Sequence, residues 1–157
     1  MLFLTHLAAA AVVGRVSRLS TLWLLVGAAL PDLLDKPLGA LGVVELYHSI
    51  GHSVFLALLF VPIALYGRAG VAAAVGWVSH LGLDALHVVI NGRPGHAVFL
   101  LWPFVEPADP LAIPPGAFFW YYLGTPSFYL EIVLWLALFA VFGSDRRSEP
   151  SLPRRVE

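Results

Sequence analysis

The 157-residue chain contains no cysteine. This absence excludes disulfides, iron–sulfur clusters and thiolate chemistry. Any metal ion must therefore be held by histidine, by carboxylate, or by amide and backbone oxygen. Such ligands favour zinc, manganese or iron over copper(I).

Charged residues are also scarce. They make up 12% of the chain, whereas a typical soluble domain has about 25%. Hydrophobic residues reach 59% and the mean hydropathy is +0.84, which points to an integral membrane protein whose partner is the lipid bilayer. The net charge of −1 and the lack of a basic, aromatic patch give no reason to expect nucleic acid binding. The composition does not indicate an oligomeric state.

Five apolar segments can be recognised, at about residues 2–13, 19–34, 52–66, 71–90 and 128–142. Only the fourth reaches the roughly 20 residues that span a bilayer unaided; the others are extended by flanking turns or lie partly re-entrant. We expect an all-α integral membrane bundle of four to five transmembrane helices, forming one domain over residues 1–143. A disordered polar tail is expected at 144–157, and the aromatic run 118–122 is expected to form an interfacial belt.

The first segment is interpreted as a retained helix rather than a signal peptide, because no Lys or Arg precedes it and it contains His6. The distribution of basic residues predicts the orientation. Seven of the nine Lys and Arg residues follow the first, third and fifth segments, and only two fall on the other side. By the positive-inside rule the N-terminus lies outside the cytoplasmic (inner) membrane and the C-terminus inside the cell.

Ionisable residues recur in pairs within this apolar sequence. The pairs are Asp32 with Asp35, His48 with His52, and His80 with Asp84. Each pair is three or four residues apart, so its members share one face where the backbone is helical. The last pair lies within the apolar run 71–90, where polar groups are costly unless they are paired or coordinated.

The predicted orientation places these residues at one depth near the extracytoplasmic face, as expected of a metal site. The candidate ligands are His6, Asp32, Asp35, His48, His52, His80 and Asp84, with His87 in reserve. They suffice for one or two divalent metals, zinc or manganese by preference, each with an open position for water. A metal lowers the pKa of its bound water to near neutrality, so that hydroxide can attack a phosphoryl or acyl centre. Asp35 or Asp84 is the candidate general base.

Several neighbouring residues have expected supporting roles. Ser49 and Ser53 are positioned in sequence to hydrogen-bond the imidazoles, and Gly76 and Gly82 leave room for close helix packing. A structural alternative exists for two of the pairs. Lys36 can simply neutralise an aspartate, and a His–Asp pair can lock helix packing without binding metal.

The order of the motifs resembles the YdjM-like family of small membrane-bound, metal-dependent hydrolases. The matching elements are Thr5-His6, Pro31-Asp32 with Asp35, the segment 48–53, His80 with Asp84, and the segment 101–104. The chain departs from the family pattern at Ser49, where Arg is common, and at Gly51, where Thr is common. The order is also similar to that of zinc-dependent phospholipase C and S1/P1 nucleases, which implies phosphoester hydrolysis by analogy.

Three functions remain open at this stage. The first is metal-dependent hydrolysis of a phosphoester in a lipid or lipid-linked substrate. The second is transport of a metal ion or proton, because intramembrane His and Asp also mark ion pathways. The third is a structural membrane protein that a metal holds together. Ligands at one depth favour a site over a conduction path, which needs polar groups at successive depths.

Overall fold

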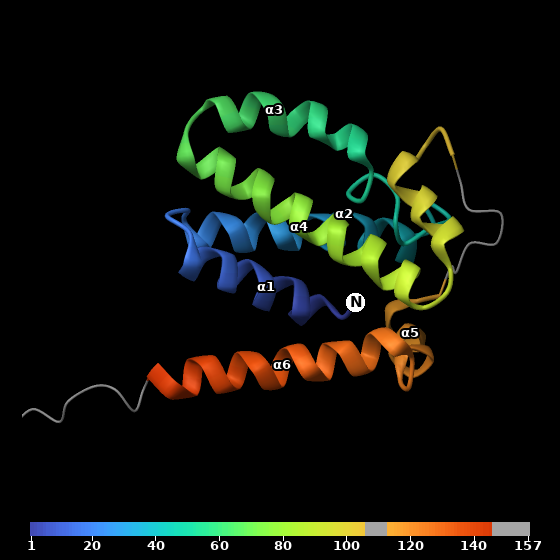
Figure 1. The fold of residues 1–157 in the computed structure, drawn as a ribbon. Coiled ribbons are helices and arrows are strands. Elements are labelled where there is room, and N and C mark those ends of the chain that lie inside the picture. Colours follow the sequence, from blue (N-terminus) through green and yellow to red (C-terminus); the bar gives the residue numbers. More distant parts are fainter. Residues whose placement is uncertain (106–112, 146–157) are drawn as a thin grey trace, which may run out of the picture.

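The computed structural model describes residues 1–105 and 113–145, and over these ranges the chain is helical and has no strand. The all-α class is therefore confirmed. The main helices and two 3₁₀ segments follow one another as shown in Figure 1: α1 (Phe3–Val16), α2 (Thr21–Ala40), η1 (Val54–Leu56), α3 (Ala57–Leu65), α4 (Arg68–Ile90), η2 (Pro94–Leu101), α5 (Pro115–Tyr122) and α6 (Pro126–Asp145).

The centre of the fold is a very close contact between α2 and α4. A Cβ atom placed on Gly27 would lie 1.9 Å from the carbonyl oxygen of Ala73, and one on Gly76 would lie 2.1 Å from that of Leu24. The two backbones can therefore touch only because both positions are glycine. This matches the expectation for Gly76. Gly82 does not share this role, because nothing lies within 4 Å of a Cβ atom built there.

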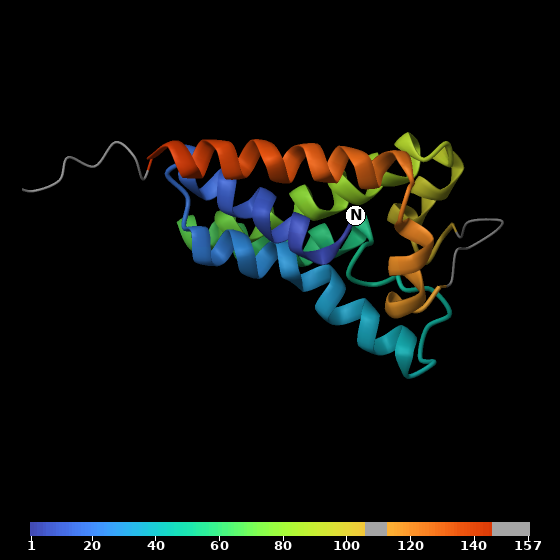
Figure 2. The ribbon, with the colours of Figure 1, turned by 90° about the horizontal axis from the view of Figure 1, so that it is seen from below.

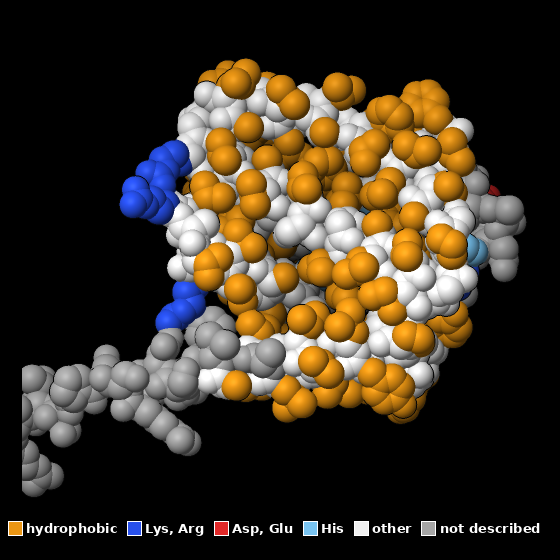
Figure 3. Space-filling view, viewed as in Figure 1, with side chains coloured by type: hydrophobic (Ala, Val, Ile, Leu, Met, Phe, Trp, Pro, Cys, Tyr) orange, Lys and Arg blue, Asp and Glu red, His pale blue; other side chains and the backbone are white. Residues whose placement is uncertain are grey.

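Two small apolar clusters extend this contact. One joins α1, α2 and α4 through Ala10, Leu24, Ala28 and Ala72, and the other joins α3 and α4 through Phe60, Ala73, Trp77 and Leu81. Many large apolar side chains lie outside these clusters and cover the exterior, as Figure 3 shows for one face. Leu58 and Leu136, for example, are 74% and 64% exposed.

The helices run alternately between two ends of the molecule. The C-terminal end of α1 and the N-terminal ends of α2 and α4 meet at the same end (Figures 1 and 2). Arg15, Arg18 and Arg68 are therefore gathered there, where the Arg68 guanidinium donates a hydrogen bond to the Arg18 carbonyl. The N-terminal residues of α1 and the C-terminal half of α4 lie away from this arginine end.

The predicted segments match α1, α2, η1 with α3, α4, and α6. Among the described residues, α4 is the one unbroken helix long and apolar enough to cross a membrane. Residues 116–122 and 126–140 would add a second span if the two helices, bent by 90°, formed one. α1 and the segment Val54–Leu65 are apolar but shorter. Helix length and composition thus do not establish a bundle of four to five spans.

The C-terminal third differs from expectation. Residues 118–122 lie in α5, and Tyr122 is fully buried instead of lying in an interfacial belt, because its hydroxyl donates to Glu131 of α6. Trp120 of the same helix is 73% exposed. α6 continues through Asp145, so the predicted tail is helical at its first two residues; the rest of that tail lies outside the described residues.

Candidate metal centre

Asp84 of α4 lies at the middle of a histidine cluster. Its Oδ2 atom is 3.1 Å from the Nε2 atom of His80, 3.3 Å from that of His52 and 3.8 Å from that of His48. Its Oδ1 atom is 3.2 Å from the Nε2 atom of His6. α1, α4 and the loop between α2 and η1 thus each direct imidazoles at one carboxylate.

A second carboxylate approaches the same point from α2. The Oδ1 atom of Asp32 lies 3.6 Å from the Nε2 atom of His52 and 3.8 Å from that of His80, and these two nitrogens are 3.1 Å apart. Four ligands at 2.0–2.1 Å around a tetrahedral zinc ion are roughly 3.3–3.4 Å from one another. The separations between His52 and His80, between His52 and Asp84 and between His80 and Asp84, at 3.1–3.3 Å, lie close to that value. Asp32 lies slightly farther from the two nitrogens, at 3.6 and 3.8 Å.

The partners of the Nδ1 atoms of His52 and His80 indicate which tautomer each ring adopts. His80 Nδ1 lies 2.6 Å from the carbonyl oxygen of Ala28, and His52 Nδ1 lies 2.7 Å from Oδ2 of Asp35. Both partners can only accept, so both Nδ1 atoms donate. In the neutral rings the two Nε2 atoms then carry lone pairs that face each other. Facing lone pairs repel each other, and a cation between them removes this repulsion. A metal ligand that donates its other ring N–H to a carboxylate or a backbone carbonyl is a recurrent arrangement in metal sites.

Asp35 lies behind His52 and organises the loop. It is fully buried, and its oxygens accept hydrogen bonds from the backbone N–H groups of Ser49, Gly51 and His52 at 2.7, 2.8 and 3.2 Å. Together with the bond from His52 Nδ1, these occupy the carboxylate. Asp35 therefore differs from its prediction as a ligand and candidate base: it belongs to none of the groups of converging ligand atoms, and its contacts orient His52.

The loop also corrects the expected geometry of His48 and His52. Residues 41–53 form turns and bends rather than a helix, so the two rings do not come from adjacent helical turns. They meet edge to face with centroids 4.5 Å apart because Asp35 gathers the loop N–H groups. The shared face was expected only for a helical backbone, and this condition is not met here, although both rings reach the cluster.

A proton competes with a metal ion for His52. Burial opposes charging of the ring, but the hydrogen bonds with Asp35 and Asp84 and the charges of both carboxylates outweigh it and raise the pKa of His52 above its usual value. Protonation of Nε2 would also relieve the contact with His80. The site is therefore built for a positive charge at this position.

Ser49 and Ser53 do not orient the imidazoles, contrary to expectation. The Ser53 hydroxyl donates to the carbonyl of Trp102 at 2.6 Å, and the buried Ser49 hydroxyl has no hydrogen-bond partner among the described residues. Gly51 is required by space, because a Cβ atom there would lie 2.7 Å from the carbonyl oxygen of Pro31. A threonine, common at this position in the YdjM-like family, would not fit without movement of the loop.

Other polar residues near the cluster escaped the sequence analysis. Glu131 of α6 is 4% exposed and accepts from the hydroxyls of Thr5 and Tyr122. It is the one charged residue in the apolar segment 128–142. A charged group in such a segment is costly unless it is paired, and this argument, used for Asp84, also singles out Glu131. His87 is bound through Nδ1 to the Ser127 hydroxyl at 2.9 Å, which ties α4 to α6 and keeps His87 out of the ligand groups.

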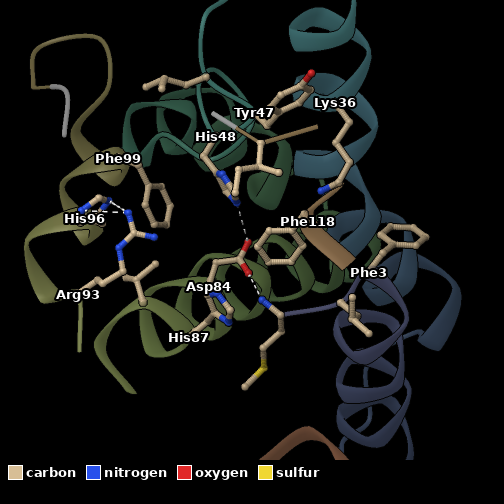
Figure 4. Close-up of a pocket in the computed structure, with 15 residues that line it drawn as sticks. Phe3, Lys36, Tyr47, His48, Asp84, His87, Arg93, His96, Phe99 and Phe118 are labelled. Atoms are coloured by element: carbon tan, nitrogen blue, oxygen red, sulfur yellow. Dashed lines mark hydrogen bonds and ion pairs between the residues drawn. The ribbon is translucent and has the colours of Figure 1, made fainter. Parts of the chain in front are cut away.

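A cavity of about 230 Å³ opens beside the cluster (Figure 4). Asp84 and His48 form its wall toward the histidines, where the Met1 amine also lies 2.9 Å from Oδ1 of Asp84. Arg93 lies on one side of Asp84 and Lys36 on the other. Most of the remaining lining is apolar.

Three overlapping groups of described residues bring one ligand atom each to within 4.8 Å of the others, and these groups can hold a metal ion: His6, His80 and Asp84; Asp32, His52 and His80; and His48, His52 and Asp84. Comparisons of the chain with protein-family models, with curated proteins and with solved structures find no significant match. The functional interpretation therefore depends on the geometry of the cluster and its cavity.

Proposed function

We propose that the chain is a membrane-bound, metal-dependent hydrolase that acts on a phosphoester of a lipid or lipid-linked substrate. One observation carries the proposal. The Nε2 atoms of His52 and His80 face each other between two carboxylates, at the edge of a cavity. This arrangement suits a divalent cation that keeps a position open toward the cavity.

Zinc is the proposed metal and manganese the alternative, because the ligands are imidazole and carboxylate. Asp32, His52 and His80 would hold the first ion, and His6 and His48 flank Asp84 at positions suited to a second. The metal would lower the pKa of a bound water to near neutrality. Asp84 is the proposed base, since it lines the cavity, whereas the carboxylate of Asp35 is occupied by hydrogen bonds from its own loop.

The exterior supports a membrane location. Large apolar side chains are exposed on α2, α3, α4 and α6, which is costly in water but favourable in lipid. Arg15, Arg18 and Arg68 gather at the end remote from the cluster, as expected for a cytoplasmic face. We propose that α1, α2, α3, α4 and α6 form the four to five spans, with the site at the extracytoplasmic side. The motif order of the YdjM-like family agrees with this assignment.

Transport of a metal ion or proton is less well supported. The buried polar side chains of the described residues gather around the cluster instead of continuing to the arginine end: Thr5, His6, Asp32, Asp35, Ser49, His52, Ser53, His80, Asp84, His87, Ser127 and Glu131. A conduction path needs polar groups at successive depths. A purely structural metal would leave the adjacent cavity without a role.

The proposal is tested with purified protein in detergent and a panel of phosphomonoesters and phosphodiesters, both soluble and lipid-borne. Hydrolysis should vanish on treatment with a chelator and return with zinc or manganese. Asp84→Asn should abolish it, while Glu45→Gln, which removes an exposed carboxylate from the same loop region, should leave it unchanged. Absence of hydrolysis from a metal-loaded protein, or hydrolysis that survives chelation, would contradict the proposal.

A further inference from the structure

The cavity beside the cluster contains a guanidinium group that no carboxylate of the described residues neutralises. Arg93, just before η2, donates to the ring of His96 with Nη2 2.8 Å from Nδ1. Lys36, on the opposite side of Asp84, is instead paired with Asp32. Within residues 1–105 and 113–145, Arg93 is thus the cavity cation that has no carboxylate partner and can meet an anion.

The contact with His96 gives Arg93 a defined direction. The ring of His96 accepts from the guanidinium, and both residues line the cavity. Figure 4 shows the two side chains together on the side of the cavity away from Lys36. A planar guanidinium with remaining N–H donors is suited to two oxygens of one phosphate.

The rest of the lining is unlike a site for a small hydrophilic ion. Aromatic and aliphatic side chains from α1, the loop before η1, α4, η2 and α5 make up most of it: Leu2, Phe3, Leu46, Val88, Phe99 and Phe118. Such a wall gains little from a free phosphate but favours burial of a hydrocarbon chain. A ligand that complements both Arg93 and the apolar lining carries an anionic group at one end and an apolar chain at the other.

We infer that Arg93, held by His96, is the head-group recognition residue for a phosphorylated amphiphile. The phosphate lies between Arg93 and the Asp84 cluster, and the apolar chain lies against Phe3 and Phe118. This inference rests on the proposed function and names the substrate class of that site.

Dodecylphosphonate is the probe, because its carbon–phosphorus bond resists hydrolysis and binding is then measured without turnover. Calorimetric titration of the metal-loaded protein in a neutral detergent should show specific binding. Methylphosphonate, which lacks the chain, and dodecyltrimethylammonium, which reverses the charge, should each bind at least tenfold more weakly. Arg93→Gln should weaken dodecylphosphonate binding by roughly tenfold or more, since it removes a charge-assisted contact. Phe3→Ala should weaken it without affecting methylphosphonate.

Arg68→Gln, at the arginine end of α4, is the matched control and should bind as the unaltered protein does. Equal binding by Arg93→Gln and Arg68→Gln would overturn the inference. If methylphosphonate binds as tightly as dodecylphosphonate, the apolar chain is not recognised. The ligand would then be a free phosphate ester and not an amphiphile. Binding that depends on Arg93 in a protein without hydrolytic activity would uphold the subsite and contradict the proposed function. Phosphoester hydrolysis that is unchanged in Arg93→Gln would uphold the proposed function and contradict the role of Arg93.

Discussion

The Nε2 atoms of His52 and His80 lie 3.1 Å apart, while the Nδ1 atom of each ring donates to a group that can only accept. The carboxylate of Asp35 and the carbonyl of Ala28 thus fix both rings with their Nε2 atoms directed at each other. Asp32 and Asp84 add negative charge at the same point. A site with this arrangement attracts a cation, and the predictions below on metal binding and activity depend on that attraction.

Asp35→Asn should weaken metal binding although Asp35 touches no metal position. The amide keeps the size of the side chain but removes the charge that orients His52, and loss of such a supporting group typically costs about 10- to 100-fold in metal affinity. Competition with a coloured zinc chelator measures the change. Glu45→Gln is the control for loss of one negative charge. Equal affinity in both variants would mean that Asp35 only shapes the loop.

Asp84→Asn should remove activity and weaken metal binding while the protein stays folded in detergent. Asparagine keeps one oxygen and the shape but not the charge that four imidazoles surround. Circular dichroism verifies the helical fold, and elemental analysis with a hydrolysis assay gives the functional result. A variant with full metal content and full activity would reduce Asp84 to a helix-packing residue.

The two ends of the bundle should lie on opposite sides of the membrane. The chain has no cysteine, so single cysteines can be introduced without background. Val16 and Leu41 are 80% and 78% exposed and mark the C-terminal ends of α1 and α2. In oriented membranes an impermeant thiol reagent should label Leu41→Cys from outside and Val16→Cys only after permeabilisation. Labelling of both from one side would contradict the orientation.

Gly76→Ala and Gly82→Ala should differ sharply although they lie on the same helix. The methyl group at position 76 would meet the backbone of Leu24, so α2 and α4 must separate, at a cost of about 1–3 kcal/mol or more. Position 82 is open, and alanine there should be neutral or stabilising by up to about 1 kcal/mol. Thermal unfolding in detergent compares the two. Similar melting temperatures would refute the close helix contact.

Much of the helical framework follows from local sequence. The long apolar run of α4 and the spacing of His80 and Asp84 predict one helix with two site residues on one face, and both residues are buried at the cluster. Periodicity captures such a pair because each residue's direction depends only on its own helix.

The loop at residues 41–53 could not be predicted in this way. His48 and His52 have helical spacing, but Asp35, more than ten residues earlier, accepts their loop's N–H groups and replaces the helical hydrogen bonds. The same limit applies to Ser53, whose partner Trp102 lies 49 positions away. Long-range hydrogen bonds leave no periodic pattern, so the roles of Asp35, Ser53 and Arg93 become visible only in the folded chain.

The central claim is that the histidine–aspartate cluster holds a divalent metal, and the metal content of the purified protein tests it most directly. Elemental analysis by mass spectrometry should find one or two equivalents of zinc or manganese in the unaltered protein. His80→Ala and His48→Ala should lower the content sharply, whereas His96→Ala, in the same cavity but outside the cluster, should not. A metal-free protein that stays metal-free when zinc is supplied, or equal metal content in all three variants, would contradict the account.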